Sequence, residues 1–223
     1  MDLRAFNSSI QQASSFLERL KFLRSTRNPT SLGVSKEFNE VALMSNVKHD
    51  AVYFSALELQ HFNILLSDYS MFQFSLTSEE PQPELRLCYI PNPSAKFEHK
   101  PSSPQNDIKV FEDMFRSGEI DFEEFSQAVA EIELAFFTPI VRVDVSFDQF
   151  KRISHPVAHM HLGLNNSSRI GLNRVWTPYL FTLFIVQNFY QSIWCNNNNE
   201  DFSLENLLKQ AKEQAMTLSE SHF

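Results

Sequence analysis

The chain has 223 residues, 43% of them hydrophobic, and a formal net charge of −8. This length and apolar content are enough for a buried core, which excludes a disordered tail. Four glycines cannot build a glycine-rich phosphate loop, so a Walker loop and a dinucleotide fingerprint are excluded. The net negative charge also opposes non-specific binding of nucleic acid by the chain as a whole.

Charge is spread unevenly along the chain. Between Arg142 and Trp176, five basic side chains stand against two acidic ones, which gives a local charge of +3. A basic, histidine-rich segment in an acidic chain favours a focused anion site, for instance for phosphate. The same local charge would also result from basic residues that are scattered over the surface and form no site.

Several features bear on the compartment. Cys88 and Cys195 match no metal-ligand spacing, so we expect free thiols in a reducing cytoplasm. The N-terminus lacks the apolar core of a signal peptide. The most apolar run, residues 179–194, contains polar residues and is shorter than a bilayer requires. We therefore predict a cytoplasmic protein without a membrane partner.

The first half of the chain predicts a helix followed by a β-hairpin. Ser8 or Ser9 can cap an amphipathic helix that ends near Arg24. Residues 52–59 fit a strand or a helix, and we expect a strand. A turn at residues 79–83 should join two strands of an antiparallel hairpin. The segments expected to be extended are residues 62–66, 69–76 and 85–90.

The middle of the chain predicts an exposed loop and two helices. Residues 91–104 are rich in proline, serine and asparagine, as is typical of a loop. Two short helices should follow, at residues 107–115 and 122–135, joined at Gly118.

Two strands of the second half carry the candidate site. Residues 139–147 alternate between valines, which should face the core, and polar side chains that include Arg142 and Asp144. Residues 158–164 alternate in the same way, so His159 and His161 share one face. If the two strands pair antiparallel, these four polar side chains converge on one surface.

Three further elements complete the chain. Residues 169–172 predict a short strand. Thr177 and Pro178 can cap and begin a buried helix that runs through residue 194. Ser203 can cap a last amphipathic helix over residues 204–217.

Together these elements predict an α+β fold, with a mainly antiparallel sheet and flanking helices in one large domain of residues 1–223. We expect its parts to be a helical region at 1–50, a hairpin at 60–91, an exposed loop at 92–106, a helical insert at 107–135, and site-bearing strands and C-terminal helices at 137–223.

The cluster fits three kinds of chemistry. In the first, His159 and His161 are the general base and acid of a metal-independent ribonuclease, because histidine changes charge near neutral pH. In the second, the cluster binds a divalent metal that activates water. In the third, it is structural. The predicted residues are His155, His159, His161 and Asp144 for catalysis or metal binding, and Arg142, Arg169 and Arg174 for anion binding.

The spacing in this region resembles a known family. The segments are Val141-Arg-Val-Asp144, then His155-Pro-x-x-His159-x-His161-x-Gly163, and then Thr177-Pro178 with the aromatic run to Tyr190. They are similar to the uncharacterised bacterial family called domain of unknown function 2290, which implies a bacterial cytoplasmic protein with no established activity. The order Arg-x-Asp and His-x-His is also similar to TumE-type toxins, which are predicted ribonucleases of toxin–antitoxin pairs.

We therefore predict a ribonuclease-like protein associated with toxin or phage-defence systems, with RNA as partner and no cofactor. The alternatives are an accessory subunit that uses a phenylalanine-rich sheet to bind a protein from the same operon, and a hydrolase that uses a divalent metal. Exposed histidines in a cleft would support chemistry, whereas buried histidines with backbone partners would support a structural role.

Overall fold

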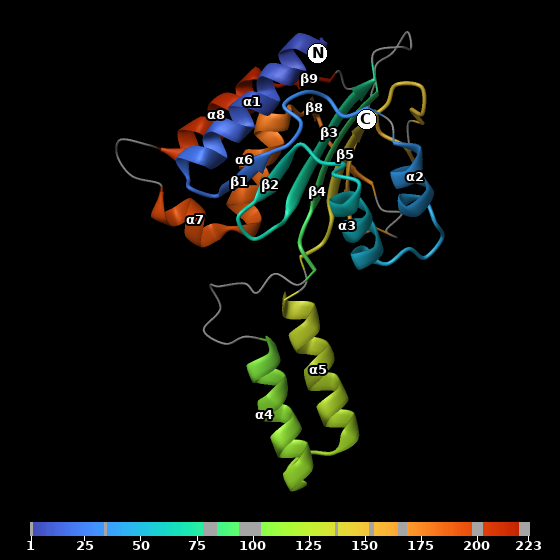
Figure 1. Cartoon of the computed structure of the whole chain (residues 1–223), viewed down its shortest axis with the longest axis vertical. Helices are drawn as coiled ribbons and strands as arrows, with labels where there is room; N and C mark the ends of the chain where they lie inside the picture. Colours follow the sequence, from blue (N-terminus) through green and yellow to red (C-terminus); the bar gives the residue numbers. More distant parts are fainter. Residues whose placement is uncertain are drawn as a thin grey trace. The chain divides into compact units, whose positions relative to one another are not determined.

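The computed structural model describes residues 2–33, 35–77, 84–93, 104–136, 138–151, 154–164, 169–197 and 203–218. The chain divides into two compact units, residues 1–93 with 139–223, and residues 94–138. We call the first the sheet unit, because it carries a seven-stranded sheet with helices (Figure 1). The second, the hairpin unit, contains a pair of helices. This content confirms the predicted α+β class.

The large sheet is a meander in which each strand is antiparallel to its neighbours in chain order. Its strands are β1 (Leu23–Thr26), β2 (Ile64–Leu66), β3 (Met71–Thr77), β4 (Glu84–Ile90), β5 (Val141–Val145), β6 (Ala158–Leu162) and β7 (Ile170–Gly171). A separate two-stranded sheet pairs β8 (Arg174–Val175) with β9 (Met216–Thr217). The predicted hairpin is β3–β4 and is confirmed, while its turn at 79–83 lies outside the described residues.

The helices of the sheet unit are α1 (Leu3–Arg19), α2 (Lys36–Ala42), α3 (His49–Glu58), α6 (Pro178–Phe189), α7 (Gln191–Asn196) and α8 (Leu204–Gln214). Those of the hairpin unit are α4 (Pro104–Ser117) and α5 (Phe122–Phe136). The predicted caps Thr177 and Ser203 are confirmed, since their hydroxyl groups accept hydrogen bonds from backbone N–H groups of the first helical turn.

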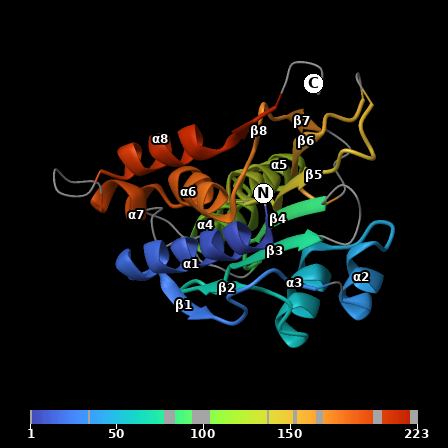
Figure 2. The ribbon, with the colours of Figure 1, turned by 90° about the horizontal axis from the view of Figure 1, so that it is seen from above.

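One face of the large sheet lies under α1, α6 and α8 (Figure 2). The valines of β5 point into this core and are at most 3% exposed. Phe72 and Phe74 are fully buried there, and both rings meet Phe181 of α6 edge to face. Burial of each such side chain contributes about 1.5–3 kcal/mol. These aromatic rings of the sheet therefore belong to the core and are not available to a partner at the surface.

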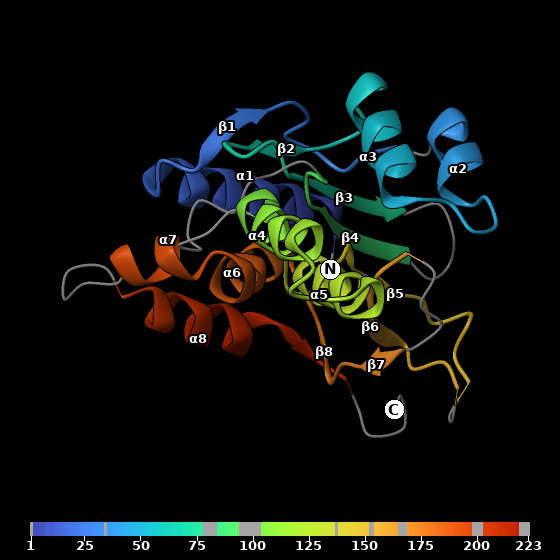
Figure 3. The same cartoon turned by 90° about the horizontal axis from the view of Figure 1, so that it is seen from below.

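The other face of the sheet is covered only in part, by α2 and α3 (Figures 2 and 3). Phe38 of α2 and Tyr53 of α3 form a second core with Met71 of β3, Cys88 of β4 and Ile140, which precedes β5. On the same face, further along the strands, lie the polar residues of β4, β5 and β6. The sheet thus has one apolar face and one divided face.

The expectation of a strand at residues 52–59 was wrong, because residues 52–58 lie within α3 and Leu59 is its C-cap. Val52, Tyr53 and Ala56 are its buried residues, and their spacing forms a helical stripe. The Tyr53 hydroxyl donates a hydrogen bond to the Tyr69 carbonyl at 3.0 Å, which fixes the helix against the β2–β3 turn.

Three predicted helix boundaries were also wrong. Helix α1 begins at Leu3, because the Asp2 carboxylate accepts from Ala5 N–H, and residues 23–26 form strand β1. The predicted helix at 178–194 breaks at Tyr190, whose hydroxyl contacts Tyr89 and Asp68. The last helix ends at Gln214, because the next residues pair with β8.

Candidate functional site

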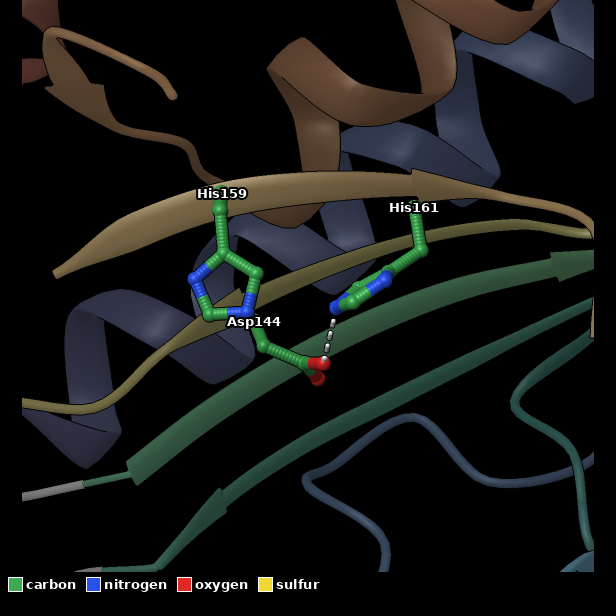
Figure 4. Close-up of side chains that lie close together, drawn as sticks. All are labelled: Asp144, His159 and His161. Atoms are coloured by element: carbon green, nitrogen blue, oxygen red, sulfur yellow. Dashed lines mark ion pairs between the residues drawn. The ribbon is translucent and has the colours of Figure 1, made fainter. Parts of the chain in front are cut away.

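The predicted convergence of polar residues on β5 and β6 is present. The two strands pair antiparallel, with Asp144 opposite His159 and Arg142 opposite His161. Because residues directly opposite each other share a face of the sheet, all four side chains lie on the partly covered face. Figure 4 shows both imidazole rings extending from β6 toward Asp144. We call Asp144, His159 and His161, together with Arg142 and Arg86, the polar cluster.

Asp144 is held by two guanidinium groups. Arg86 Nε donates to Oδ1 at 3.0 Å, and Arg142 Nε donates to Oδ2 at 2.7 Å. Burial raises the pKa of Asp144, but the charges of Arg142 and Arg86 outweigh it, so this pKa lies below the ordinary value. The carboxylate is therefore ionised at neutral pH.

Arg86 and Arg142 mark the solvent side of the cluster. Their side chains are 54% and 36% exposed, whereas Asp144 is 15% exposed. Each arginine contacts Asp144 through Nε. The terminal nitrogens of both side chains are N–H₂ donor groups of the kind that bind phosphate oxygens. The two guanidinium groups and one carboxylate carry a joint charge of +1.

His159 has one nitrogen committed and one available. Its Nδ1 lies 2.8 Å from the Pro156 carbonyl, which can only accept, so Nδ1 carries the proton. Its Nε2 then bears a lone pair, and no described residue donates to it. Burial is the main cause that lowers the pKa of His159 below 6.5. This imidazole is therefore neutral near pH 7.

His161 and His155 flank His159. The ring centroids of His159 and His161 are 4.9 Å apart, and those of His155 and His159 are 4.7 Å apart. His161 Nε2 lies 3.6 Å from Asp144 Oδ2, a pair that becomes ionic when the imidazole is protonated. His155 Nε2 is buried without a hydrogen-bond partner among the described residues, and burial is the first cause that lowers the pKa of His155.

Both central histidines are buried. His159 is 2% exposed and His161 is 6% exposed, and His159 has a backbone partner. By the criterion of exposure, these facts favour a structural role. The free lone pair of His159 Nε2 points the other way, because Nδ1 alone makes the bond to Pro156 and leaves Nε2 available for chemistry.

A metal ion is the second arrangement to test. Asp144, His159 and His161 can each offer one ligand atom, and these atoms lie within 4.8 Å of one another. The hydrogen bond from His159 to Pro156 is of the kind that orients metal-binding imidazoles. Both carboxylate oxygens, however, accept from arginines, so a dication would lie beside two positive charges. His155 is not part of this group.

The structure separates the two remaining predicted arginines. Arg169 precedes β7, and its charge contributes to lowering the pKa of His155 and His159 after burial, so it lies near the cluster. Arg174 lies in β8, and its guanidinium donates to the Lys212 carbonyl of α8. Its side chain is thus engaged with α8.

Arg86 was missed by the sequence analysis. It contacts Asp144 because β4 pairs with β5, with Arg86 opposite Asp144 across 58 residues of chain. Arg86 alternates with the buried Leu85 and Leu87, so it faces away from the core. Only the pairing of the two strands identifies it as part of the cluster.

A cavity of about 370 Å³ lies elsewhere, against α1. It is lined by Ser8, Gln11, Gln12, Ser15, Phe16, Arg19, Tyr179 and Leu207. None of these residues belongs to the polar cluster, so the cavity does not decide what the cluster does.

Comparison with known proteins places the chain in a family. The model of the family described as uncharacterized conserved protein (DUF2290) matches residues 17–223. The chain belongs to this family. The match spans the large sheet, the polar cluster and both helices of the hairpin unit. No curated protein and no solved structure matches the chain.

Two further observations bear on the expectations for this DUF2290 member. Within the described residues, no helix is both long and apolar enough to cross a bilayer. Cys88 and Cys195 are free thiols, as predicted. Cys88 lies opposite Arg142 in the sheet, and burial raises the pKa of its thiol to about 12, so it is no nucleophile at neutral pH.

Proposed function

We propose that the chain is a metal-independent, ribonuclease-like enzyme that uses the polar cluster for acid–base chemistry. The observation that carries the proposal is His159 Nε2, a lone pair on a neutral imidazole that no described residue satisfies. A general base needs this state, because it must take up a proton at neutral pH.

RNA is the proposed substrate because it contains its own nucleophile. His159 Nε2 takes the proton of the ribose 2′-hydroxyl, and the 2′-oxygen bonds to the adjacent phosphorus. The bond from phosphorus to the 5′-oxygen breaks, and protonated His161 supplies the proton to that oxygen. The products are a 2′,3′-cyclic phosphate and a 5′-hydroxyl. The proposed reaction needs no metal, since His159 serves as base, His161 as acid and the ribose 2′-hydroxyl as nucleophile.

The arginines provide the charge that this reaction requires. The terminal nitrogens of Arg86 and Arg142 can donate to the non-bridging oxygens of the phosphate, where negative charge develops. Asp144 fixes both guanidinium groups through Nε and lies beside His161. In this account Asp144 is a positioning residue.

The test is cleavage of RNA by the purified chain, with and without EDTA. We expect cleavage that survives EDTA and is lost in His159→Asn, whose amide nitrogen can replace Nδ1 as donor to Pro156 but which lacks Nε2. His61→Asn is the matched control, because His61 packs against Phe38 in the second core. Equal cleavage by wild type and folded His159→Asn would overturn the proposal.

A metal-dependent hydrolase is the second candidate, favoured by the three ligand atoms within 4.8 Å of one another. It predicts that EDTA abolishes cleavage and that Zn²⁺ or Mn²⁺ restores it. It also predicts that Asp144→Asn weakens metal binding measured by calorimetry. Cleavage in EDTA would eliminate this candidate.

A further inference from the structure

The turn of the hairpin unit is firmly specified by its local contacts. Gly118, with φ +79°, ends α4, and the N–H groups of Gly118 and Glu119 donate to the Phe115 and Met114 carbonyls. Helix α5 begins with a reciprocal pair in which Asp121 Oδ1 accepts from Glu124 N–H and Glu124 Oε2 accepts from Asp121 N–H. The hairpin tip is therefore a defined structure.

The described side chains of the hairpin unit form no buried core. Residues 107–130 include no buried side chain, and none of them belongs to either hydrophobic core of the sheet unit. At the tip, Phe115 stacks on Phe125 at 5.3 Å between ring centroids and meets Phe122 at 6.3 Å. Phe115 is nonetheless 40% exposed and Phe122 70% exposed. Two helices alone leave one apolar face uncovered.

The two helices of the hairpin unit are also strongly acidic. Residues 104–136 contain nine acidic and two basic side chains, a net charge of −7, while the whole chain has a net charge of −8. One of the basic side chains, Arg116, lies 4.0 Å from Glu112 on the same helix. This charge opposes docking of nucleic acid or an anionic membrane, and it opposes pairing with a second copy of the same hairpin.

We propose that the hairpin tip, formed by Phe115, Phe122 and Phe125 with the carboxylates around them, docks a basic amphipathic helix of a partner protein. A third helix covers the open face of a helix pair, with apolar residues at spacings of three and four as anchors. Phe122 is the central anchor because its side chain is the most exposed of the three phenylalanines at the tip. Lysine and arginine at the rim of the partner helix pair with Asp113, Glu119 and Glu123.

The proposal is independent of the cleavage chemistry and can be tested with an unbiased probe. A displayed library of helical peptides is selected against the full chain and counter-selected against Phe122→Ser. We expect the enriched peptides to be basic and amphipathic. Enrichment of neutral or acidic peptides, or no enrichment over the Phe122→Ser chain, would overturn the proposal.

The best peptide is then measured by fluorescence anisotropy against three variants. Phe122→Ser should weaken binding at least tenfold, on the order expected for an aromatic anchor, whereas Phe122→Leu should retain most of it. Leu43→Ser is the matched control, because Leu43 is 77% exposed and lies outside the hairpin unit. Higher salt should weaken binding of the peptide. Equal binding to wild type and Phe122→Ser, both folded by circular dichroism, would contradict the assignment.

Discussion

Alternate residues of strand β5 lie on opposite faces of the large sheet, one apolar and one polar. Val141, Val143 and Val145 lie in the core, at most 3% exposed, where close contact with neighbouring side chains stabilises the sheet. Arg142 and Asp144 lie on the other face and form charged contacts to β4 and β6. The apolar face thus supplies stability. The polar face holds paired charges and a histidine nitrogen with a free lone pair, an arrangement that fits chemistry.

The largest expected effect is that of His159→Asn, a substitution on the polar face, on the rate of RNA cleavage. Loss of the general base should lower kcat/KM for RNA by about 10²–10⁴-fold. The free energy of unfolding should change by no more than about 1 kcal/mol, because the asparagine amide can retain the bond to Pro156. Cleavage kinetics and urea unfolding measure the two effects. A rate that falls only in proportion to lost folded protein would refute a catalytic role.

The converse substitution is Leu87→Ala on the apolar face. Leu87 is fully buried and lies opposite Val143 in the sheet. Its truncation should lower the free energy of unfolding by about 2–5 kcal/mol through lost burial and the cavity left behind. The cleavage rate per folded molecule should stay unchanged. If the cleavage rate per folded molecule fell as well, stability and cleavage would not depend on separate faces of the sheet.

Asp144→Asn should have an intermediate effect on stability. It leaves Arg86 and Arg142 without their counter-charge, at a cost of about 1–3 kcal/mol, reduced because both arginines reach solvent. The folded-state pKa of Asp144 lies below its ordinary value, so the carboxylate stabilises the fold above about pH 4. The difference in the free energy of unfolding between wild type and Asp144→Asn should therefore shrink as pH falls further. A gap that is constant from pH 7 to pH 3 would contradict the paired carboxylate.

The smallest expected effect is the pH dependence of stability that His159 confers. Because burial holds its folded pKa below 6.5, the unfolded chain binds a proton first as pH falls. The contribution of neutral His159 to stability is complete above about pH 6.5 and is lost as pH falls through the folded pKa. The acid limb of the profile of kcat/KM should also lie below pH 6.5. Comparison of the unfolding free energy of wild type and His159→Asn between pH 7.5 and 5 isolates this contribution.

The sequence predicted the polar cluster as far as local patterns reach. Alternation placed Arg142 with Asp144 and His159 with His161, since side chains on a strand repeat every two residues. Arg86 could not be assigned to the cluster, because its contact depends on a strand pairing across the whole hairpin unit. Arg174 was predicted to bind an anion together with Arg142, whereas the structure places it in β8, for a related reason. Its strand pairs with residues 216–217, a segment that the pattern predicted to be helical.

The helical expectations show the same limit. The caps at Thr177 and Ser203 are local and were found, whereas the break at Tyr190 depends on Tyr89 and Asp68, which are distant in sequence. Residues 52–59 became a helix through burial of one stripe against the sheet. Where local preference is weak, tertiary contacts thus decide the secondary structure.

The most direct test of the central claim is the chemistry of the RNA ends after incubation with the chain in EDTA. Wild type is predicted to leave 2′,3′-cyclic phosphates and 5′-hydroxyls, detected by end-specific ligation, and His159→Asn is predicted to leave neither above background. DNA of the same sequence should remain intact, because it lacks the 2′-hydroxyl. Intact RNA with wild-type protein, 3′-hydroxyl ends, or cyclic phosphates from His159→Asn at the wild-type rate would contradict the account.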